Sequence, residues 1–295
     1  MAETGQIVTI LPQHRTAIAA VRPDLQAVAL TPIGNGWDAF AIRAGTTLFK
    51  FPVGAGAADR LRREPKFLDL MRPHVALQLP KMHLHETPML MSEHEMVEGV
   101  PVDAARYAAL GEPARAALAD DLATFFIAAH AVPAQRVRAK KCDGVRAWPS
   151  PERLRHVIAD APGDVVAAAN DLLARFARHP PDETVVGQFD THGWNMAFDD
   201  GAERLNGLFD FAGSGIGPLH RDLSYLHFTS AHLAQAVVER YAAQTGRAVS
   251  FARTLDTHGA LKVIELAEEM LAGAPITRFC AAVLQFAAER DGPLH

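Results

Sequence analysis

The chain has 295 residues, 49% of them hydrophobic, and a net charge of −5, which suits one large domain or two lobes and excludes the basic surface of a typical nucleic-acid-binding protein. No apolar run reaches the roughly 18 residues of a membrane span, so no membrane association is expected. Two distant cysteines, Cys142 and Cys280, and an N-terminus without a basic and apolar leader pattern predict a cytoplasmic protein with reduced thiols.

The first fifty residues predict three strands that follow a short helix. Gly34-Asn35-Gly36 and Gly45-Thr46 are turn signals between apolar segments. Gly34 and Gly36 allow backbone N–H groups to approach phosphates, although an ordinary hairpin turn explains them equally well. The expected elements are a helix over Pro12 to Val21 and strands over Gln26 to Thr31, Ala39 to Ile42 and Thr47 to Phe51.

A lysine and a glutamate follow in the next segment. Lys50 lies between two phenylalanines on the third strand, where it is either a phosphate ligand or an exposed strand lysine. The apolar spacing over Ala57 to Met71 predicts a helix that carries Glu64, and Pro65 is unfavourable inside it. Glu64 is either a partner for Lys50 or a member of the charged helix face formed with neighbouring arginines.

Two further strands, Val75 to Pro80 and Met89 to Ser92, complete the predicted sheet. The segment Glu93 to Gly99 then reads as a linker between two lobes, with the boundary near residues 97–101. An edge strand with a turn is the other interpretation of this segment.

The rest of the chain predicts helices around one distinctive stretch. The helices are expected over Arg115 to Ala131, Ser150 to Ala159, Gly163 to Arg178, Asp222 to Gln235, Ala236 to Thr245, Thr254 to Ala272 and Thr277 to Glu289. A strand-rich first part and a helical second part predict an α+β fold. His130 near the end of one helix is expected to be a core histidine.

The stretch from Val185 to Leu226 carries the chemistry. Asp190 and Asn195 are expected on one loop, and a β-hairpin returns the chain to Asp210. An aspartate can accept the proton of a substrate hydroxyl, and an asparagine with a second aspartate supplies the hard oxygen ligands that Mg²⁺ prefers. A surface hairpin with unrelated acids is the alternative.

This stretch resembles the active site of the aminoglycoside phosphotransferase family, which has a protein-kinase-like fold. Its members carry His-Gly-Asp, a four-residue gap and Asn, then Ile-Asp-Phe and a downstream Gly and Asp-Leu. The matching positions here are Asp190, Asn195, Asp210, Phe211, Gly217 and Asp222. Gln188-Phe189 replaces the usual His-Gly, which affects the support of the loop more than metal binding. We interpret His192 as a further support of this loop.

The resemblance implies a two-lobed enzyme: a nucleotide-binding lobe over residues 1–98, with a small antiparallel sheet and one main helix, and a mostly helical lobe over residues 99–295. Asp190 would be the catalytic base, and Asn195 and Asp210 would hold Mg²⁺. Lys50, fixed by Glu64, would bind the phosphates of ATP or GTP. The linker residues Glu95, Met96 and Val97 would bind the base.

The implied function is phosphorylation of a small-molecule hydroxyl, as in an aminoglycoside or amino alcohol. Three tail acids, Glu265, Glu268 and Glu269, are candidates for binding a polycationic acceptor, although acidic helix surfaces are common. Because Gln188-Phe189 departs from the family, a nucleotide-binding pseudokinase that acts as a regulatory or scaffold module is the alternative.

Overall fold

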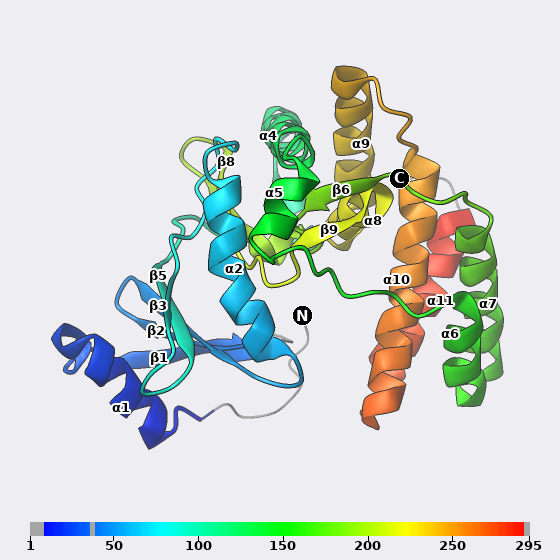
Figure 1. The fold of residues 1–295 in the computed structure, drawn as a ribbon. Helices are drawn as coiled ribbons and strands as arrows, with labels where there is room; N and C mark the ends of the chain where they lie inside the picture. The colour runs from blue at the N-terminus through cyan, green and yellow to red at the C-terminus, as the bar shows by residue number, and fades with distance from the viewer. Residues whose placement is uncertain (1–8, 36–38, 292–295) are drawn as a thin grey trace.

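A five-stranded antiparallel sheet forms the N-terminal lobe of the computed structural model, which describes residues 9–35 and 39–291 (Figure 1). The strand order is β1-β2-β3-β5-β4. On β3, Phe49 and Phe51 point to one face and Lys50 to the other, as the two-residue repeat of a strand requires. The strands are β1 Leu30–Asn35, β2 Ala39–Ala44, β3 Thr47–Pro52, β4 His83–His85 and β5 Met91–Glu95.

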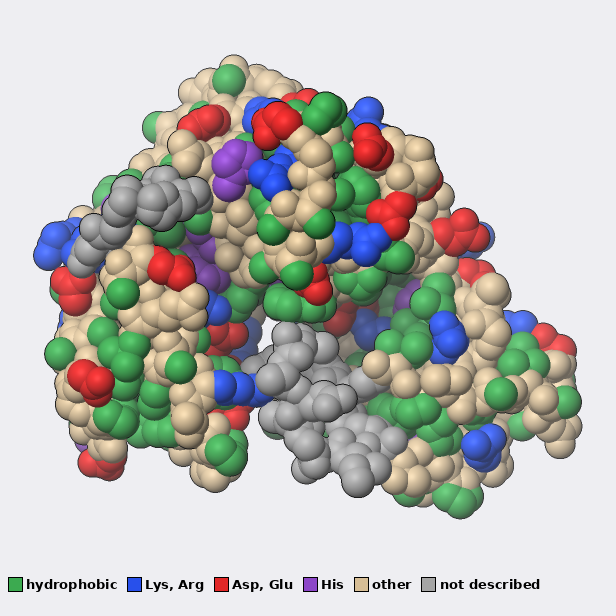
Figure 2. All heavy atoms as spheres, turned by 180° about the vertical axis from the view of Figure 1, so that it is seen from behind, with side chains coloured by type: hydrophobic (Ala, Val, Ile, Leu, Met, Phe, Trp, Pro, Cys, Tyr) green, Lys and Arg blue, Asp and Glu red, His purple; other side chains and the backbone are tan. Residues whose placement is uncertain are grey.

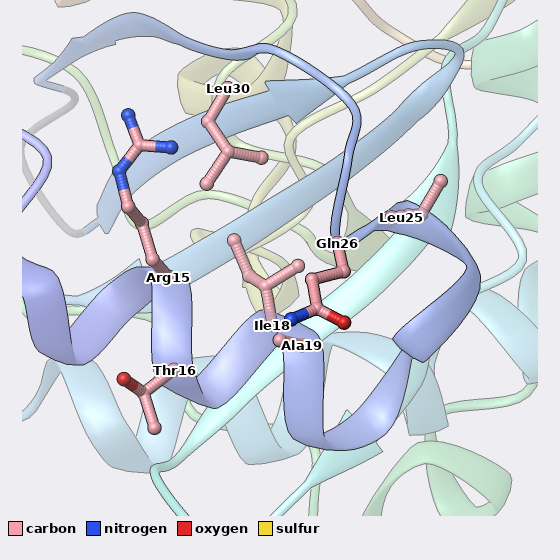
Figure 3. Close-up of a pocket in the computed structure, with 7 residues that line it drawn as sticks. All are labelled: Arg15, Thr16, Ile18, Ala19, Leu25, Gln26 and Leu30. Atoms are coloured by element: carbon pink, nitrogen blue, oxygen red, sulfur yellow. The ribbon is translucent and has the colours of Figure 1, made fainter.

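Helix α1 (Pro12–Val21) covers the phenylalanine face of this sheet. Ile18 is buried with Phe40, Ile42 and Phe49 in a core that belongs to this lobe. A small cavity remains between α1, the 3₁₀ turn η1 (Pro23–Leu25) and the start of β1, where side chains such as Ile18 and Leu30 point into it (Figure 3). The cavity arises from the packing of α1 on the sheet, on the face opposite Lys50.

Helix α2 (Ala57–Met71) lies between the sheet and the C-terminal lobe (Figure 1). Its apolar residues Leu61, Phe67, Leu68 and Met71 are buried in the main core of the C-terminal lobe and not in the core of the sheet. The helix continues through Pro65, whose missing N–H costs one internal hydrogen bond. Glu64 is therefore held by a helix that is anchored in the larger lobe.

The C-terminal lobe contains two helical cores. The main core includes α4, α9 and the strands near the Asp190 loop, and the second joins α6, α7, α10 and α11 (Figure 1). The helices are α3 Ala104–Ala109, α4 Glu112–His130, α5 Ala134–Ala139, α6 Pro151–Val157, η2 Ile158–Asp160, α7 Gly163–Ala177, α8 Leu219–Ser224, η4 Tyr225–Phe228, α9 Ala231–Thr245, α10 Phe251–Ala272 and α11 Thr277–Asp291.

Two small antiparallel pairs hold the loop that begins at Asp190. β6 (Thr184–Gly187) pairs with β9 (Gly215–Pro218), and β7 (Met196–Asp199) pairs with β8 (Arg204–Leu208). The loop leaves β6, passes through the 3₁₀ turn η3 (Gly193–Asn195) and enters β7. Asp210 follows the end of β8, so the β7–β8 hairpin brings it back to the loop.

Three sequence predictions about these elements are wrong in detail. The first strand lies at Leu30–Asn35 and not at Gln26 to Thr31, because the chain is still turning after η1. Val75 to Pro80 forms no strand of the sheet: Gln78 instead makes an isolated bridge to Gly207 of β8 in the other lobe. The break between the helices after Asp222 falls before Ala231 and not at residue 235, because the Ser230 side chain accepts the N–H of residue 232 and caps α9.

The remaining predicted helices and the α+β class are confirmed, with boundaries that shift by a few residues. The short helices α3 and α5 have no counterpart in the prediction. Within residues 9–35 and 39–291, no helix combines the length and the apolar character needed to cross a membrane.

Candidate active site

A buried ionic cluster joins the sheet, α2 and the segment after β8. Lys50 Nζ lies 3.0 Å from both carboxylate oxygens of Glu64 and 2.9 Å from Asp210 Oδ1. The Phe211 N–H donates to Glu64 Oε1 over 2.9 Å. The structure thus brings together the lysine and glutamate that sequence spacing suggested, and it adds Asp210 to the same cluster.

The cluster is closed on one side and open on the other. The side chains of Lys50 and Glu64 are 8% and 1% exposed, whereas that of Asp210 is 40% exposed. Burial disfavours a charged lysine, but Asp210 and Glu64 outweigh it and raise the pKa of Lys50. Burial would likewise raise the pKa of Asp210, but the charge and hydrogen bond of Lys50 outweigh this and lower it. Lys50 and Asp210 are therefore both charged at neutral pH.

The Asp190 loop is held by its own polar side chains. Asn195 Nδ2 donates to the backbone carbonyl and to Oδ2 of Asp190, each over 2.9 Å. His192 Nε2 lies 3.3 Å from Asp190 Oδ1. Burial would lower the pKa of His192, but the Asp190 carboxylate outweighs it and raises the pKa. These contacts orient the Asp190 carboxylate, which is partly accessible.

Gln188 links this loop to the segment that carries Asp210. Its Nε2 donates to the carbonyls of Phe209 and Asp210 over 2.9 and 3.1 Å, and its Oε1 accepts from the Thr191 hydroxyl over 2.8 Å. Although the histidine usual in the resembling family is absent here, the glutamine is buried and its amide supports the loop through both of its polar atoms.

Phe189 and Asp210 both adopt left-handed backbone, with φ of 58° and 60°. A phenylalanine in this region is strained, so its surroundings must stabilise it. The Phe189 N–H donates to Asp222 Oδ1 over 2.5 Å, and its ring covers Gly217, where a Cβ would lie 2.7 Å from a ring atom. A glycine at 217 is thus required for the ring to fit.

Asp222 supports the loop from within the core. It is fully buried, and His130 Nε2 lies 3.0 Å from its Oδ2 while His130 Nδ1 lies 2.8 Å from the Tyr241 hydroxyl. His130 is thus a core histidine, as the sequence suggested. A Cβ on Gly187 would lie 2.0 Å from Asp222, so the strand before the loop must carry glycine there.

Asn195 and Asp210 could hold a magnesium ion. The Phe209 N–H donates to the Asn195 carbonyl over 3.0 Å, which places the two side chains on adjacent segments. Asn195 uses its Nδ2 for Asp190, so its Oδ1 is left for a cation, and the Asp210 carboxylate is open. Two hard oxygens suit Mg²⁺, which usually completes its coordination with phosphates and water. In the described part of the chain, no group of three or more His, Cys, Asp and Glu residues forms a metal cluster.

The predicted nucleotide-binding residues lie along the sheet. Gly34 is paired with Ala41 at the end of β1, and Gly36 lies outside the described residues. The Met96 N–H donates to the Thr46 carbonyl over 2.9 Å, and the Thr47 hydroxyl donates to Glu95 over 3.0 Å, so both are used within the sheet. The Val97 N–H has no acceptor among the described residues.

A second charged cluster lies along α10. Sequence reasoning named its acids as candidates but did not find the cations that pair with them. Lys262 pairs with Glu265 over 3.2 Å and Arg146 pairs with Glu268 over 2.9 Å. The i,i+3 spacing of Lys262 and Glu265 was the available signal. Glu269, the third tail acid, is buried. From behind, acidic, basic and histidine side chains are visible on both sides of the region between the lobes (Figure 2).

The sequence matches the model of a family described as the phosphotransferase enzyme family over residues 29–258. This range includes all the residues of the ionic cluster and of the Asp190 loop. A search of curated proteins finds no match.

Solved structures share the fold at low sequence identity. An aminoglycoside 2'-phosphotransferase-IIIa in its GDP complex superposes with a TM-score of 0.80 at 17% identity, covering 94% of this chain and 97% of that one. A ternary complex of an aminoglycoside phosphotransferase with streptomycin and ATP gives 0.67 at 15% identity, covering 96% and 99%. A type I macrolide 2'-phosphotransferase gives 0.66 at 18% identity, covering 94% and 97%.

Proposed function

This chain belongs to the phosphotransferase enzyme family, and we propose that it transfers the γ-phosphate of ATP or GTP to a hydroxyl group of a small molecule. The observation that carries this proposal is the convergence of two groups. The Asp190–Asn195 loop lies against the segment of Asp210, and Asp210 is bonded to Lys50 of the sheet. The residues proposed as base, metal ligands and phosphate-binding cation therefore lie close together.

The nucleotide lies between the lobes in this proposal. Lys50, oriented by Glu64, neutralises its phosphates. Glycines 34 and 36 allow the backbone near the first turn to approach the phosphates, and the segment Glu95 to Val97 binds the base through its backbone. The Val97 N–H, which has no acceptor among the described residues, supports that assignment. Residues 1–98 would thus supply most nucleotide contacts and residues 99–295 the catalytic loop, metal site and acceptor contacts.

Asn195 and Asp210 would hold Mg²⁺ together with the nucleotide phosphates, and the ion would offset the negative charge of the transferred group. A chelator should then abolish turnover, and added Mg²⁺ should restore it. Turnover that is unchanged after chelation would remove this role from both residues.

Asp190 orients the acceptor hydroxyl and takes its proton. The hydroxyl oxygen forms a bond to the γ-phosphorus, the bond from that phosphorus to the bridging oxygen breaks, and a nucleoside diphosphate leaves with the electron pair. Asn195 and His192 hold the Asp190 carboxylate in place during this step. Because the transition state of phosphoryl transfer is loose, positioning and electrostatics supply most of the rate.

The pseudokinase alternative draws on Gln188-Phe189. The hydrogen bonds from Gln188 to the carbonyls of Phe209 and Asp210 argue against a pseudokinase, because they support the catalytic loop. A chain without catalysis has no need for that support together with the Lys50–Glu64–Asp210 cluster.

A coupled turnover assay tests the function. It uses Mg²⁺, ATP and GTP over a panel of hydroxyl compounds that includes aminoglycosides, macrolides, amino alcohols and sugars. Asp190→Asn should lower acceptor-dependent turnover by about 10² to 10⁴ and leave nucleotide affinity nearly unchanged. Asp59→Asn, which alters an exposed acid of α2, is the matched control. Equal turnover in Asp190→Asn and the wild type would refute the assignment, and nucleotide binding without any turnover would favour the pseudokinase.

A further inference from the structure

We propose that the acceptor of this enzyme is a hydroxyl compound with an apolar face and at most one positive charge, and that Lys262 and Arg146 exclude polycationic acceptors. This inference rests on the proposed function, since it concerns the compound that Asp190 deprotonates. It assigns specificity to a set of charges beside the catalytic loop.

A continuous series of contacts connects these charges to Asp190. The Asp190 carboxylate touches His192, and the His192 ring lies 6.0 Å from the Phe228 ring at a steep angle. Lys262 Nζ lies 3.7 Å from the centre of the Phe228 ring on η4. The face of α10 that carries Lys262 therefore borders the space next to the reacting hydroxyl.

The acids on this face are already neutralised. Glu265 pairs with Lys262 and Glu268 pairs with Arg146, and three of these four side chains are less than a quarter exposed. Burial raises the pKa of both glutamates in spite of these cations. Tail acids that sequence alone offers as amine ligands are thus occupied by internal cations.

A third cation, Arg221, lies near Glu268 on this side. Arg221 is buried, its guanidinium lies 4.6 Å from the centre of the Trp148 ring, and it donates to the Arg146 carbonyl over 2.7 Å. The adjacent Asp222 carboxylate attracts its charge. Glu265 and Glu268 are thus each paired with an internal cation, and Arg221 adds a further positive charge near Glu268, which opposes a ligand with several ammonium groups.

Aromatic rings supply the rest of this surface. Trp148, Tyr225 and Phe228 are partly exposed, and Trp194 of the catalytic loop stands edge-on to His192 at 5.5 Å. Rings of this kind bind the apolar faces of sugars and macrocycles. A polycation would have to displace Lys262 from both Glu265 and the Phe228 ring before it could pair with the acid.

Calorimetric titration of kanamycin, a polycationic probe, tests the proposal without requiring turnover. Titrations are made with a non-hydrolysable nucleotide and Mg²⁺ present. Lys262→Met should tighten kanamycin binding about tenfold, because it frees Glu265 for an ammonium group. Arg146→Met, which removes the cation of a more exposed pair, should also tighten kanamycin binding, but by a smaller factor. Lys81→Met removes an exposed lysine of the N-terminal lobe and should leave the affinity within about twofold.

Two results would overturn the proposal. One is a change of less than about threefold on Lys262→Met in a protein whose circular dichroism is that of the wild type. The other is kanamycin-dependent turnover by the wild type with a larger kcat/KM than that of any uncharged acceptor. If Lys262→Met does not fold, Arg146→Met decides, and an unchanged affinity there counts against the proposal. The Asp190→Asn turnover comparison tests the proposed function separately. Failure of the proposed function can therefore be distinguished from failure of the proposed acceptor specificity.

Discussion

Lys50→Met isolates the electrostatics of the buried cluster. The substitution keeps the length and apolar stem of the side chain and removes only the charge that Glu64 and Asp210 share. Both carboxylates contact the same nitrogen, at 3.0 and 2.9 Å, so they are separated by no more than about 6 Å. Without the cation, two negative charges remain together in a largely buried place.

Their repulsion is about 3 kcal/mol at that separation with an effective dielectric constant of about 20. Because Asp210 is 40% exposed, solvent screens part of this, and we expect the free energy of unfolding to fall by about 2 kcal/mol at pH 8. One carboxyl of the variant then has a folded-state pKa above its unfolded value. Between these two pKa values the folded state binds more protons than the unfolded state, so the variant becomes more stable as the pH falls. The destabilisation relative to the wild type should therefore shrink to about 1 kcal/mol at pH 5.

Urea unfolding at pH 5 and pH 8 measures this difference. In the wild type the pKa of Asp210 is lowered by Lys50, so Asp210 adds no pH dependence in that range. Lys66→Met, at an exposed position of α2, should change stability by less than about 0.5 kcal/mol at either pH. A Lys50→Met variant that is as stable as the wild type, or equally destabilised at both pH values, would refute the electrostatic reasoning.

Three further outcomes are expected. Asp222→Asn should lower the free energy of unfolding by about 2–4 kcal/mol, because an amide cannot replace the buried carboxylate that accepts from Phe189 and contacts a histidine; a melting temperature like that of the wild type would contradict it. Gln188→Leu should lower the free energy of unfolding by about 1–3 kcal/mol and reduce kcat, because two backbone carbonyls lose their hydrogen-bond donor. Gln188→His should retain more activity than the leucine variant. Equal kcat in the two variants would count against the role of Gln188 in supporting the loop. Burial lowers the pKa of His227 to about 3, so the unfolded state binds more protons below about pH 6.5 and stability falls there by up to about 1.4 kcal/mol per pH unit. His227→Phe should flatten the stability curve between pH 6 and 4, and an unchanged slope in denaturation curves would disprove this contribution.

Local order along the chain explains how much of the candidate site could be predicted. Asp190, Asn195 and Asp210 lie within 21 positions of one another, and a loop followed by a short hairpin necessarily brings them back together. Lys50 and Glu64 needed only a strand and the next helix, so their contact was also accessible. Their catalytic roles stay predictions.

Long-range packing explains what could not be predicted. Val75 to Pro80 has the apolar alternation of a strand, but its Gln78 N–H donates to Asn206 and its carbonyl accepts from Leu208, far along the chain. The left-handed backbone at residue 189 is not marked by a glycine in the sequence, because a phenylalanine occupies it. The buried Asp222 carboxylate, 33 residues away, stabilises this conformation. The pairing of Arg146 with Glu268 likewise depends on how a loop lies against α10.

The burial of α2 in the core of the larger lobe determines which parts of the molecule can move. The Phe67 ring of this helix lies 6.2 Å from the Phe211 ring, and Arg63 donates to the Gly144 carbonyl over 2.7 Å, so α2 is fastened to the C-terminal lobe. A relative rotation of the lobes would carry β3 past a stationary helix. The distance from Lys50 to Glu64 would then report on lobe closure. A pair of spectroscopic labels on β3 and α2 would detect this closure, whereas a pair on α2 and α4 would not.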